Sequence, residues 1–309
     1  ALEWTDIRSV RNTVQGTLPD GRPRYQAQAA NSGNNFDMIL TNDSRGYSWN
    51  IVGRFDKQWD NGFNAGAAFT WQRVKDVNSG TSSVASSNYN QSASLDPNFA
   101  AYGTSIYQRD NSLRIELGYE KEFFGDNATR FDFFFNSISG QRFSYTMTDG
   151  VFATVNGVRT LVARDAANRS AIFGVQGQNN RHLFYVPNVA SPTADPIVTY
   201  APGFDFAGFQ SFVQNGDLNK YQGQIAPKNI GQSPRVNKLD LRISQEITFV
   251  LNGKVQLFAD FENVLNMLNK DWGSLRQVAF PYFASVVQVT CPTAVSASTI
   301  SKLANALAW

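Results

Sequence analysis

Apolar and polar residues alternate along three stretches of the chain, at residues 46–71, 109–145 and 236–263. An alternation with period two places every second side chain on the same face of a β-strand. Each stretch is long enough for two strands and carries a turn signal between them, so we expect three β-hairpins. The clearest alternation sets Leu113, Ile115, Leu117 and Tyr119 against Arg114, Glu116, Gly118 and Glu120.

The turns inside the hairpins are short, whereas the segments between the hairpins are long, polar and without a sustained period. Asn-Gly, which occurs in two of the turns, is a strong hairpin signal. Turns at one end of the strands and long loops at the other are typical of an outer-membrane β-barrel, with short periplasmic turns and long extracellular loops. The predicted turns are residues 60–62, 125–127 and 252–253, and the predicted loops are residues 11–44, 78–104, 146–235 and 264–309.

Each hairpin has one apolar face and one face that carries charge. Charged side chains are tolerated on the water-filled lumen side of a membrane barrel and are destabilising on its lipid side. We therefore expect the apolar series of the second hairpin, from Leu113 to Phe135, to face lipid. The candidates for the lumen face are Arg114, Glu116, Asp132, Asp240, Arg242 and Asp260.

Aromatic residues gather near both ends of the predicted strands. Two such belts, separated by about the thickness of a bilayer, fit the interfacial girdles of a membrane barrel. The alternative is a β-sandwich core with aromatic ends. The girdle candidates are Phe55, Trp59 and Phe123 near the turns, and Trp71, Phe143 and Tyr145 near the loops.

Composition permits more than one class of β-protein. The 309 residues are 42% apolar and 13% aromatic but only 17% charged, which fits a membrane barrel and also some soluble all-β proteins. The net charge of +2, without a basic run, gives no support for nucleic-acid binding. No stretch approaches the ~18 apolar residues of a transmembrane helix, but a barrel strand needs only about 9 to 11 residues.

The chain offers few residues for catalysis or metal binding. His182 is the single histidine and there is one cysteine, so neither a multi-histidine site nor a paired-cysteine site can form. Asp260 and Glu262 share a strand face, and paired carboxylates can hydrolyse glycosides. Arg242 and Lys254 are expected on that same face, which favours a charge ladder. We therefore expect no enzyme, no cofactor and no metal site.

Four segments carry a family pattern: LRIELGYEKEFFGDNATRFDFFFNSISGQRFSYTM at residues 113–147, HLFYVP at 182–187, FQSFVQNGDLNKYQGQIAPKNIGQSPRVNKLDLRISQEI at 209–247 and FADFENVLNMLNKDWGSLRQV at 258–278. Together and in this order they resemble the C-terminal part of TonB-dependent outer-membrane receptors, in the Oar-like branch. In HLFYVP, His182 or Leu183 replaces the acidic residue usual in that branch. The resemblance covers roughly residues 105–289.

This resemblance implies an all-β fold, a transmembrane antiparallel barrel of about 22 strands around an N-terminal plug. It implies ligand capture by extracellular loops and uptake energised by TonB, in the outer membrane of a Gram-negative bacterium. The implied partners are outer-membrane lipid and lipopolysaccharide, TonB and an unidentified ligand. About seven strands and no plug are recognisable, so we expect residues 1–309 to be part of a barrel whose plug lies outside this segment.

The partial barrel carries a further expectation about its edges. Residues 2–10 and 254–263 should pair with strands outside the segment, because open strand edges do not occur facing lipid. Two other functions remain open. One is a structural or adhesive outer-membrane barrel without active transport, and the other is a secreted carbohydrate-binding β-protein, which would need a buried core between two sheets.

Overall fold

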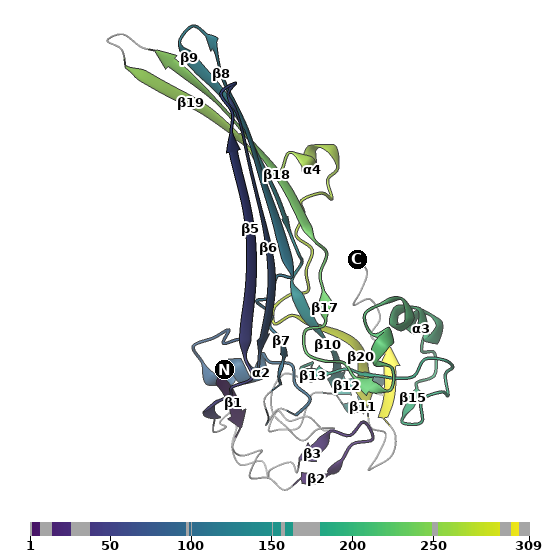
Figure 1. Cartoon of the computed structure of the whole chain (residues 1–309). Coiled ribbons are helices and arrows are strands. Elements are labelled where there is room, and N and C mark those ends of the chain that lie inside the picture. Colours follow the sequence, from purple (N-terminus) through teal and green to yellow (C-terminus); the bar gives the residue numbers. More distant parts are fainter. Residues whose placement is uncertain are drawn as a thin grey trace.

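A long single-layer sheet rises from a folded lobe in the computed structural model (Figure 1). The structure describes residues 2–6, 14–25, 38–96, 99, 101–149, 151–155, 158–162, 180–248, 253–290 and 298–302. We call the six long strands of the sheet the wall. They are β5 (Tyr47–Gln58), β6 (Phe63–Asp76), β8 (Asn111–Phe124), β9 (Asn127–Ile138), β18 (Val236–Thr248) and β19 (Lys254–Phe261).

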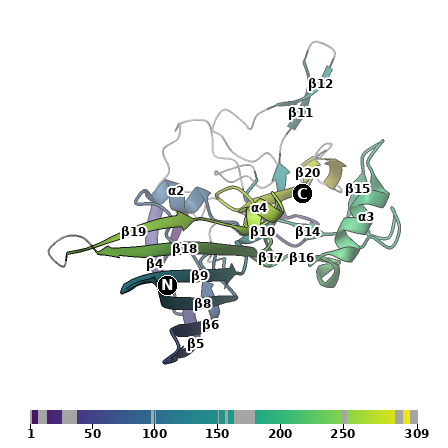
Figure 2. The same ribbon diagram turned by 90° about the horizontal axis from the view of Figure 1, so that it is seen from above.

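The wall confirms the three predicted hairpins, β5–β6, β8–β9 and β18–β19, which pair antiparallel in the order β19-β18-β9-β8-β6-β5. Seen from above, these strands lie side by side in one layer (Figure 2). Five of them contain 12 to 14 residues, and β19 contains 8. At about 3.4 Å per residue, 12 residues span about 40 Å.

The strand register collects the apolar residues of all six strands on one face. One row across the wall runs from Ala65 through Leu117, Phe133 and Leu241 to Phe261, each directly opposite the next. Directly opposed residues of antiparallel strands lie on the same face. The predicted alternation is therefore confirmed. Most charged residues occupy the other face, which Val52, Phe134 and Phe258 interrupt, whereas Lys57, Arg73 and Lys75 lie near the ends of the apolar face.

No second layer covers this apolar face in the described part of the chain. Leu117 is 51% exposed, Phe133 40% and Phe261 44%. Soluble domains bury such a face against another element. The buried core between two sheets that a carbohydrate-binding protein would need is not formed by the described wall.

The wall has two edges, β5 and β19, and the described strands do not close into a barrel. The expectation that residues 2–10 pair outside the segment was wrong for β1 (Leu2–Asp6), which pairs with β4 (Met38–Asn42). The rest of that range, residues 7–10, lies outside the described residues. For β19, pairing along its open edge stays a prediction.

The turns of the first two hairpins lie at one end of the wall, and most of the long connecting segments lie at the other (Figure 1). Gly62 has φ 87°, a left-handed conformation that favours glycine. A Cβ atom at Gly62 would also collide with the backbone oxygen of Glu120, so this turn depends on glycine. In the third predicted turn, residues 252–253, residue 252 lies outside the described residues.

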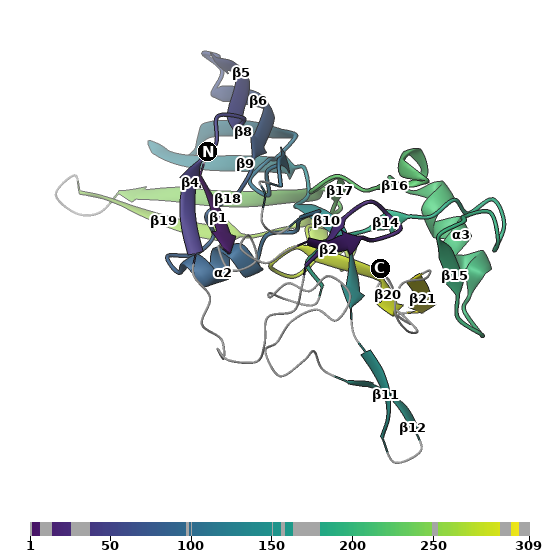
Figure 3. The same cartoon turned by 90° about the horizontal axis from the view of Figure 1, so that it is seen from below.

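The segments predicted as loops fold in large part into the lobe, which contains the elements at the loop end of the wall (Figure 3). Described elements of all four predicted loops lie at this end, except α4 (Leu265–Leu268) in the last one, but the prediction that residues 146–235 lack regular structure was wrong. The N-terminal and linking elements are β2 (Val14–Thr17), β3 (Pro23–Tyr25), α2 (Ala85–Asn90), β7 (Gly103–Thr104), β10 (Arg142–Asp149), β11 (Val151–Val155), β12 (Val158–Val162), β13 (His182–Leu183), β14 (Tyr185–Val186) and β15 (Val198–Tyr200). They are followed by α3 (Phe206–Asn215), the 3₁₀ turn η1 (Asn219–Tyr221), β16 (Gln224–Ile225), β17 (Gly231–Gln232), β20 (Phe283–Thr290) and β21 (Ser298–Lys302). The short helix α4 is not part of the lobe and lies beside the wall near β18 (Figure 1).

The lobe has the hydrophobic core that the wall lacks. Phe184, Val186, Val189 and Val213 are each 0% exposed and pack with Phe209 of α3. The Asp205 carboxylate accepts a hydrogen bond from the Gly208 N–H and caps α3. None of the described helices is long and apolar enough to cross a membrane.

The core predicts a local stability effect. Replacing Phe184 by alanine should lower the free energy of unfolding of the lobe by about 3–5 kcal/mol, because it leaves a cavity. Phe258→Ala is the matched control, since the Phe258 side chain is 64% exposed on the wall and its loss should change stability by less than about 0.5 kcal/mol. Urea unfolding of the two variants measures the difference, and equal losses would contradict the assignment of the core.

Candidate functional site

Alternating rows of basic and acidic side chains cross the charged face of the wall. Strand register aligns each row, with neutral residues between the charged ones. Within strands the rows neutralise one another, as Arg54 Nε lies 2.6 Å from Asp56 Oδ2 and Lys238 Nζ 3.3 Å from Asp240 Oδ1. The basic row contains Arg54, Arg114 and Lys238, and the adjacent acidic row contains Asp56, Glu116 and Asp240.

The next row brings three of the predicted residues together. Arg242 lies directly opposite Asp132 on one side and Asp260 on the other. Its guanidinium donates to both carboxylate oxygens of Asp260, at 2.6 and 2.8 Å. Arg130 Nε donates to Asp132 Oδ1 at 2.9 Å. Of the paired carboxylates considered for catalysis, Asp260 is thus engaged by Arg242, and Glu262 Oε2 lies 3.3 Å from Lys238 Nζ, which supports the charge-ladder interpretation.

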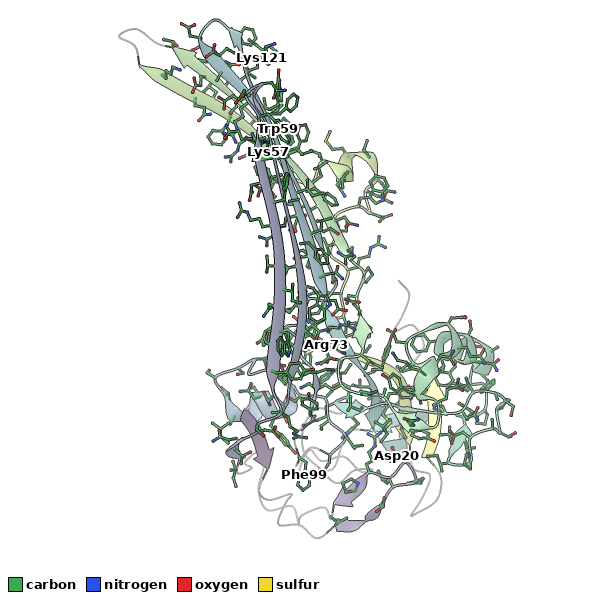
Figure 4. The ribbon with its side chains drawn as sticks, in the orientation of Figure 1. Asp20, Lys57, Trp59, Arg73, Phe99 and Lys121 are labelled. Atoms are coloured by element: carbon green, nitrogen blue, oxygen red, sulfur yellow. The ribbon has the colours of Figure 1, made fainter. Side chains whose placement is uncertain are left out.

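The charged face carries both signs and is open to water. Exposed ion pairs contribute only about 0–1 kcal/mol each to stability, so the ladder is not what holds the wall together. Figure 4 shows side chains projecting from both faces along the length of the wall. The arrangement provides many hydrogen-bonding groups without a field of one sign, which suits a hydrated surface facing polar solutes.

A buried ion pair joins the lobe to the base of β6. The Lys228 side chain is 5% exposed, and its Nζ lies 2.7 Å from Asp76 Oδ1 and 3.3 Å from the Val77 carbonyl oxygen. Burial lowers the pKa of Lys228, and the Asp76 carboxylate opposes that change. Loss of one partner of a buried pair is strongly destabilising, so this contact fixes the segment at Lys228 against the wall.

Asn229 extends this junction to two more strands. It is 2% exposed and has φ 55°, a left-handed conformation that asparagine tolerates. Its Oδ1 accepts from Ser144 Oγ at 2.7 Å, and its Nδ2 donates to the Thr104 carbonyl at 2.7 Å. The segment at Lys228 and Asn229 therefore ties together β6, β7 and β10.

Two arginine residues also link the lobe to the wall. Arg142 at the start of β10 pairs with Asp110, which immediately precedes β8. Arg235, next to β18, donates to Asn111, Ser137 and Ser139. Arg142, where the chain enters the lobe, and Arg235, where it returns to the wall, thus both contact residues at the ends of wall strands.

A small cavity adjoins this junction, lined in part by Asn78, Thr81, Gln91, Lys228 and Asn229. Its volume of ≈ 20 Å³ suits one water molecule. Pockets for drug-sized ligands measure about 300–1,000 Å³. The cavity is therefore too small to be a capture site for such a ligand.

Three buried basic side chains in the lobe were missed by sequence reasoning: Arg22, Arg181 and His182. Arg22 and Arg181 are 1% exposed and His182 is 0% exposed, although a surface loop was expected at His182. Arg22 Nη2 donates to the Leu183 carbonyl at 2.6 Å, and the Arg181 guanidinium lies 4.2 Å from the Tyr89 ring centroid. These contacts join residues up to 161 positions apart, so no local sequence pattern could reveal them.

The girdle candidates divide into two groups. At the turn end, Phe55 is 59% exposed, Trp59 43% and Phe123 51%, and at the loop end Trp71 is 37% exposed. The prediction was wrong for Phe143 and Tyr145, which are 4% and 8% exposed in the lobe core.

The physical reason is a departure of the chain from the wall after β9. A Cβ atom at Gly140 would collide with the backbone of Ser233, so glycine permits a close crossing there. The chain then enters β10, which pairs with β13, β17 and β20 instead of continuing the hairpin.

Among the described residues, no three His, Cys, Asp or Glu side chains gather in a way that could hold a metal ion. Cys291 lies outside the described residues. Comparison with protein-family models, with curated proteins and with solved structures finds no match to this chain.

Burial of Tyr145 has a measurable consequence at high pH. Desolvation, followed by the charge of Asp217, raises the pKa of Tyr145 to about 12 from the usual 10.0. The unfolded chain ionises first as pH rises, so the stability from neutral Tyr145 is complete below pH 10.0 and is lost toward about pH 12. When urea unfolding is measured across this pH range, the free energy of unfolding of Tyr145→Phe should fall less with rising pH than that of the unmodified protein. Exposed Tyr107→Phe is the control, and an equal effect of both variants would contradict the burial of Tyr145.

Proposed function

We propose that this chain supplies wall strands and extracellular loops of a TonB-dependent outer-membrane receptor, which captures a ligand with its loops and imports it using energy from TonB. The observation that carries the proposal is the continuous apolar face of a single-layer sheet. Lipid is the solvent that would cover such a face without a second protein layer.

The two faces of the wall support this assignment together. In a membrane barrel, residues facing lipid alternate with residues facing a polar lumen. The apolar row from Ala65 to Phe261 would face lipid, and the row containing Asp132, Arg242 and Asp260 would face the lumen. Five wall strands exceed the ~9–11 residues that a tilted transmembrane strand requires.

The lobe would then lie outside the cell and contribute to ligand capture. Its own core and the Lys228–Asp76 pair hold it in a defined position on the wall. A defined lobe can present a preorganised binding surface, which lowers the entropy lost on binding. The small cavity at the junction cannot enclose a drug-sized ligand, so capture would use another part of the lobe.

Lipid exposure can be tested with nitroxide labels. In a Cys291→Ser background, Leu117→Cys and Phe133→Cys should give labels accessible to oxygen dissolved in lipid, because their side chains lie on the apolar face. Glu116→Cys is the matched control and should be accessible to a water-soluble nickel chelate. Electron paramagnetic resonance in bilayers measures both, and chelate access at all three positions would refute a membrane wall.

Active transport requires a second test, because a structural or adhesive barrel would have the same lipid face. The intact protein, purified in detergent, should be retained by an immobilised C-terminal domain of TonB. A mock column without that domain is the control. Lipid-exposed labels together with no retention by TonB would favour the structural or adhesive function.

A further inference from the structure

Two basic residues stand where the apolar face of the wall meets the lobe. Arg73 and Lys75 follow Trp71 along β6 at intervals of two residues, so all three share the apolar face. Trp49 lies directly opposite Arg73, and Tyr47 opposite Lys75. Trp49 is 64% exposed and Tyr47 is 40% exposed. This end of the face therefore combines two cations with exposed aromatic rings.

The two cations have no carboxylate partner among the described residues. The Lys75 ammonium donates to Thr104 Oγ1 at 2.8 Å, and the ion pairs of the nearby junction engage Arg142 and Lys228 instead. On the opposite face of the neighbouring strand, Arg54 is neutralised by Asp56. Arg73 and Lys75 thus add positive charge that the described residues leave uncompensated.

The distance between the charged residues at the two ends of this face is close to the height of the apolar band of a membrane barrel. Lys57, near the turn end, lies opposite Ala65, eight residues before Arg73 on β6. Eight residues correspond to about 27 Å along a strand. Tilt of a barrel strand shortens the height to about 20 Å, close to the ~25 Å apolar band of membrane barrels. In Figure 4, Lys57, Trp59 and Lys121 lie toward the turn end and Arg73 lies at the junction with the lobe.

We propose that Arg73 and Lys75 bind the phosphate groups of a phosphorylated lipid in the leaflet on the loop side, with its acyl chains along the apolar face of β5 and β6. This inference rests on the proposed function. Arginine forms bidentate hydrogen bonds with phosphate, and lysine adds a point charge. Tryptophan and tyrosine favour the interface between apolar chains and headgroups.

The position of the pair determines the kind of ligand. An acidic protein or a free phosphate would use the cations but not the adjoining apolar band. An uncharged lipid would use the band but not the cations. A ligand with both an anionic headgroup and apolar chains satisfies the two parts of the site at once, because they are contiguous on one face.

The test measures lipid affinity of the intact protein, purified in detergent, by native mass spectrometry. The probes are lipid A and the same lipid after removal of its phosphates. The double variant Arg73→Gln with Lys75→Gln should weaken binding of the phosphorylated lipid about 30-fold, or about fivefold for each charge. Its affinity for the dephosphorylated lipid should not change. The charge-preserving double variant Arg73→Lys with Lys75→Arg should retain most of the binding, and Arg54→Gln controls for charge loss on the other face.

Unchanged affinity of the Gln double variant for lipid A would overturn the inference. Displacement of lipid A by an equal concentration of inorganic phosphate would also overturn it, because the site would then recognise free phosphate. The nitroxide labels at Leu117 and Phe133 separate this failure from that of the proposed function. Lipid-exposed labels with unchanged lipid affinity would reject only the phosphate site, whereas water-exposed labels would reject the membrane wall.

Discussion

The register of the backbone hydrogen-bond ladder is the constraint on which the wall depends. Side chains alternate across a sheet with period two, so a slip of one residue between neighbouring strands would move a whole apolar set to the other face. Here five successive pairings agree, and residues as distant in sequence as Ala65 and Phe261 share one row. The two faces of the wall differ in polarity because of that agreement.

The wall has no hydrophobic core of its own, so packing within the wall does not fix the positions of its strands at the loop end. That end is held by the lobe, where buried side chains such as Phe184 and Val213 provide close packing. The Lys228–Asp76 pair and Asn229 then connect that packing to the ends of the strands. The backbone hydrogen bonds therefore stabilise the sheet, whose two faces are exposed, and the core of the compact lobe stabilises its loop end.

Sequence reasoning predicted the hairpins because their signals are local. Alternation along β8 and β9, and Asn61-Gly62 at the first turn, each lie within a few residues. The shared face of Asp132, Arg242 and Asp260 was predicted from the alternation, but their direct alignment depends on strand register, which the sequence did not predict. The lobe was not predictable in this way, because its contacts join distant segments, as between Arg22 and Leu183. Within the lobe, a local signal existed only for α3, where Phe206, Phe209 and Val213 recur at helical spacing. The apolar residues of β10 were misassigned to the wall because nothing in the alternation marks the bend at Gly140.

The two faces of the wall also differ in how their cations are neutralised. On the charged face, Arg54, Arg242 and Lys254 each contact a carboxylate within 3 Å. On the apolar face, cations occur only toward the ends of the strands, and none forms an ion pair among the described residues. In water an exposed ion pair contributes little to stability, so exposure to water on both faces would not explain why the cations are paired on one face and unpaired on the other. It is the arrangement expected where one face meets a hydrated space and the other meets an apolar layer bounded by anionic groups, because the cations of the second face then take their counter-charges from outside the protein.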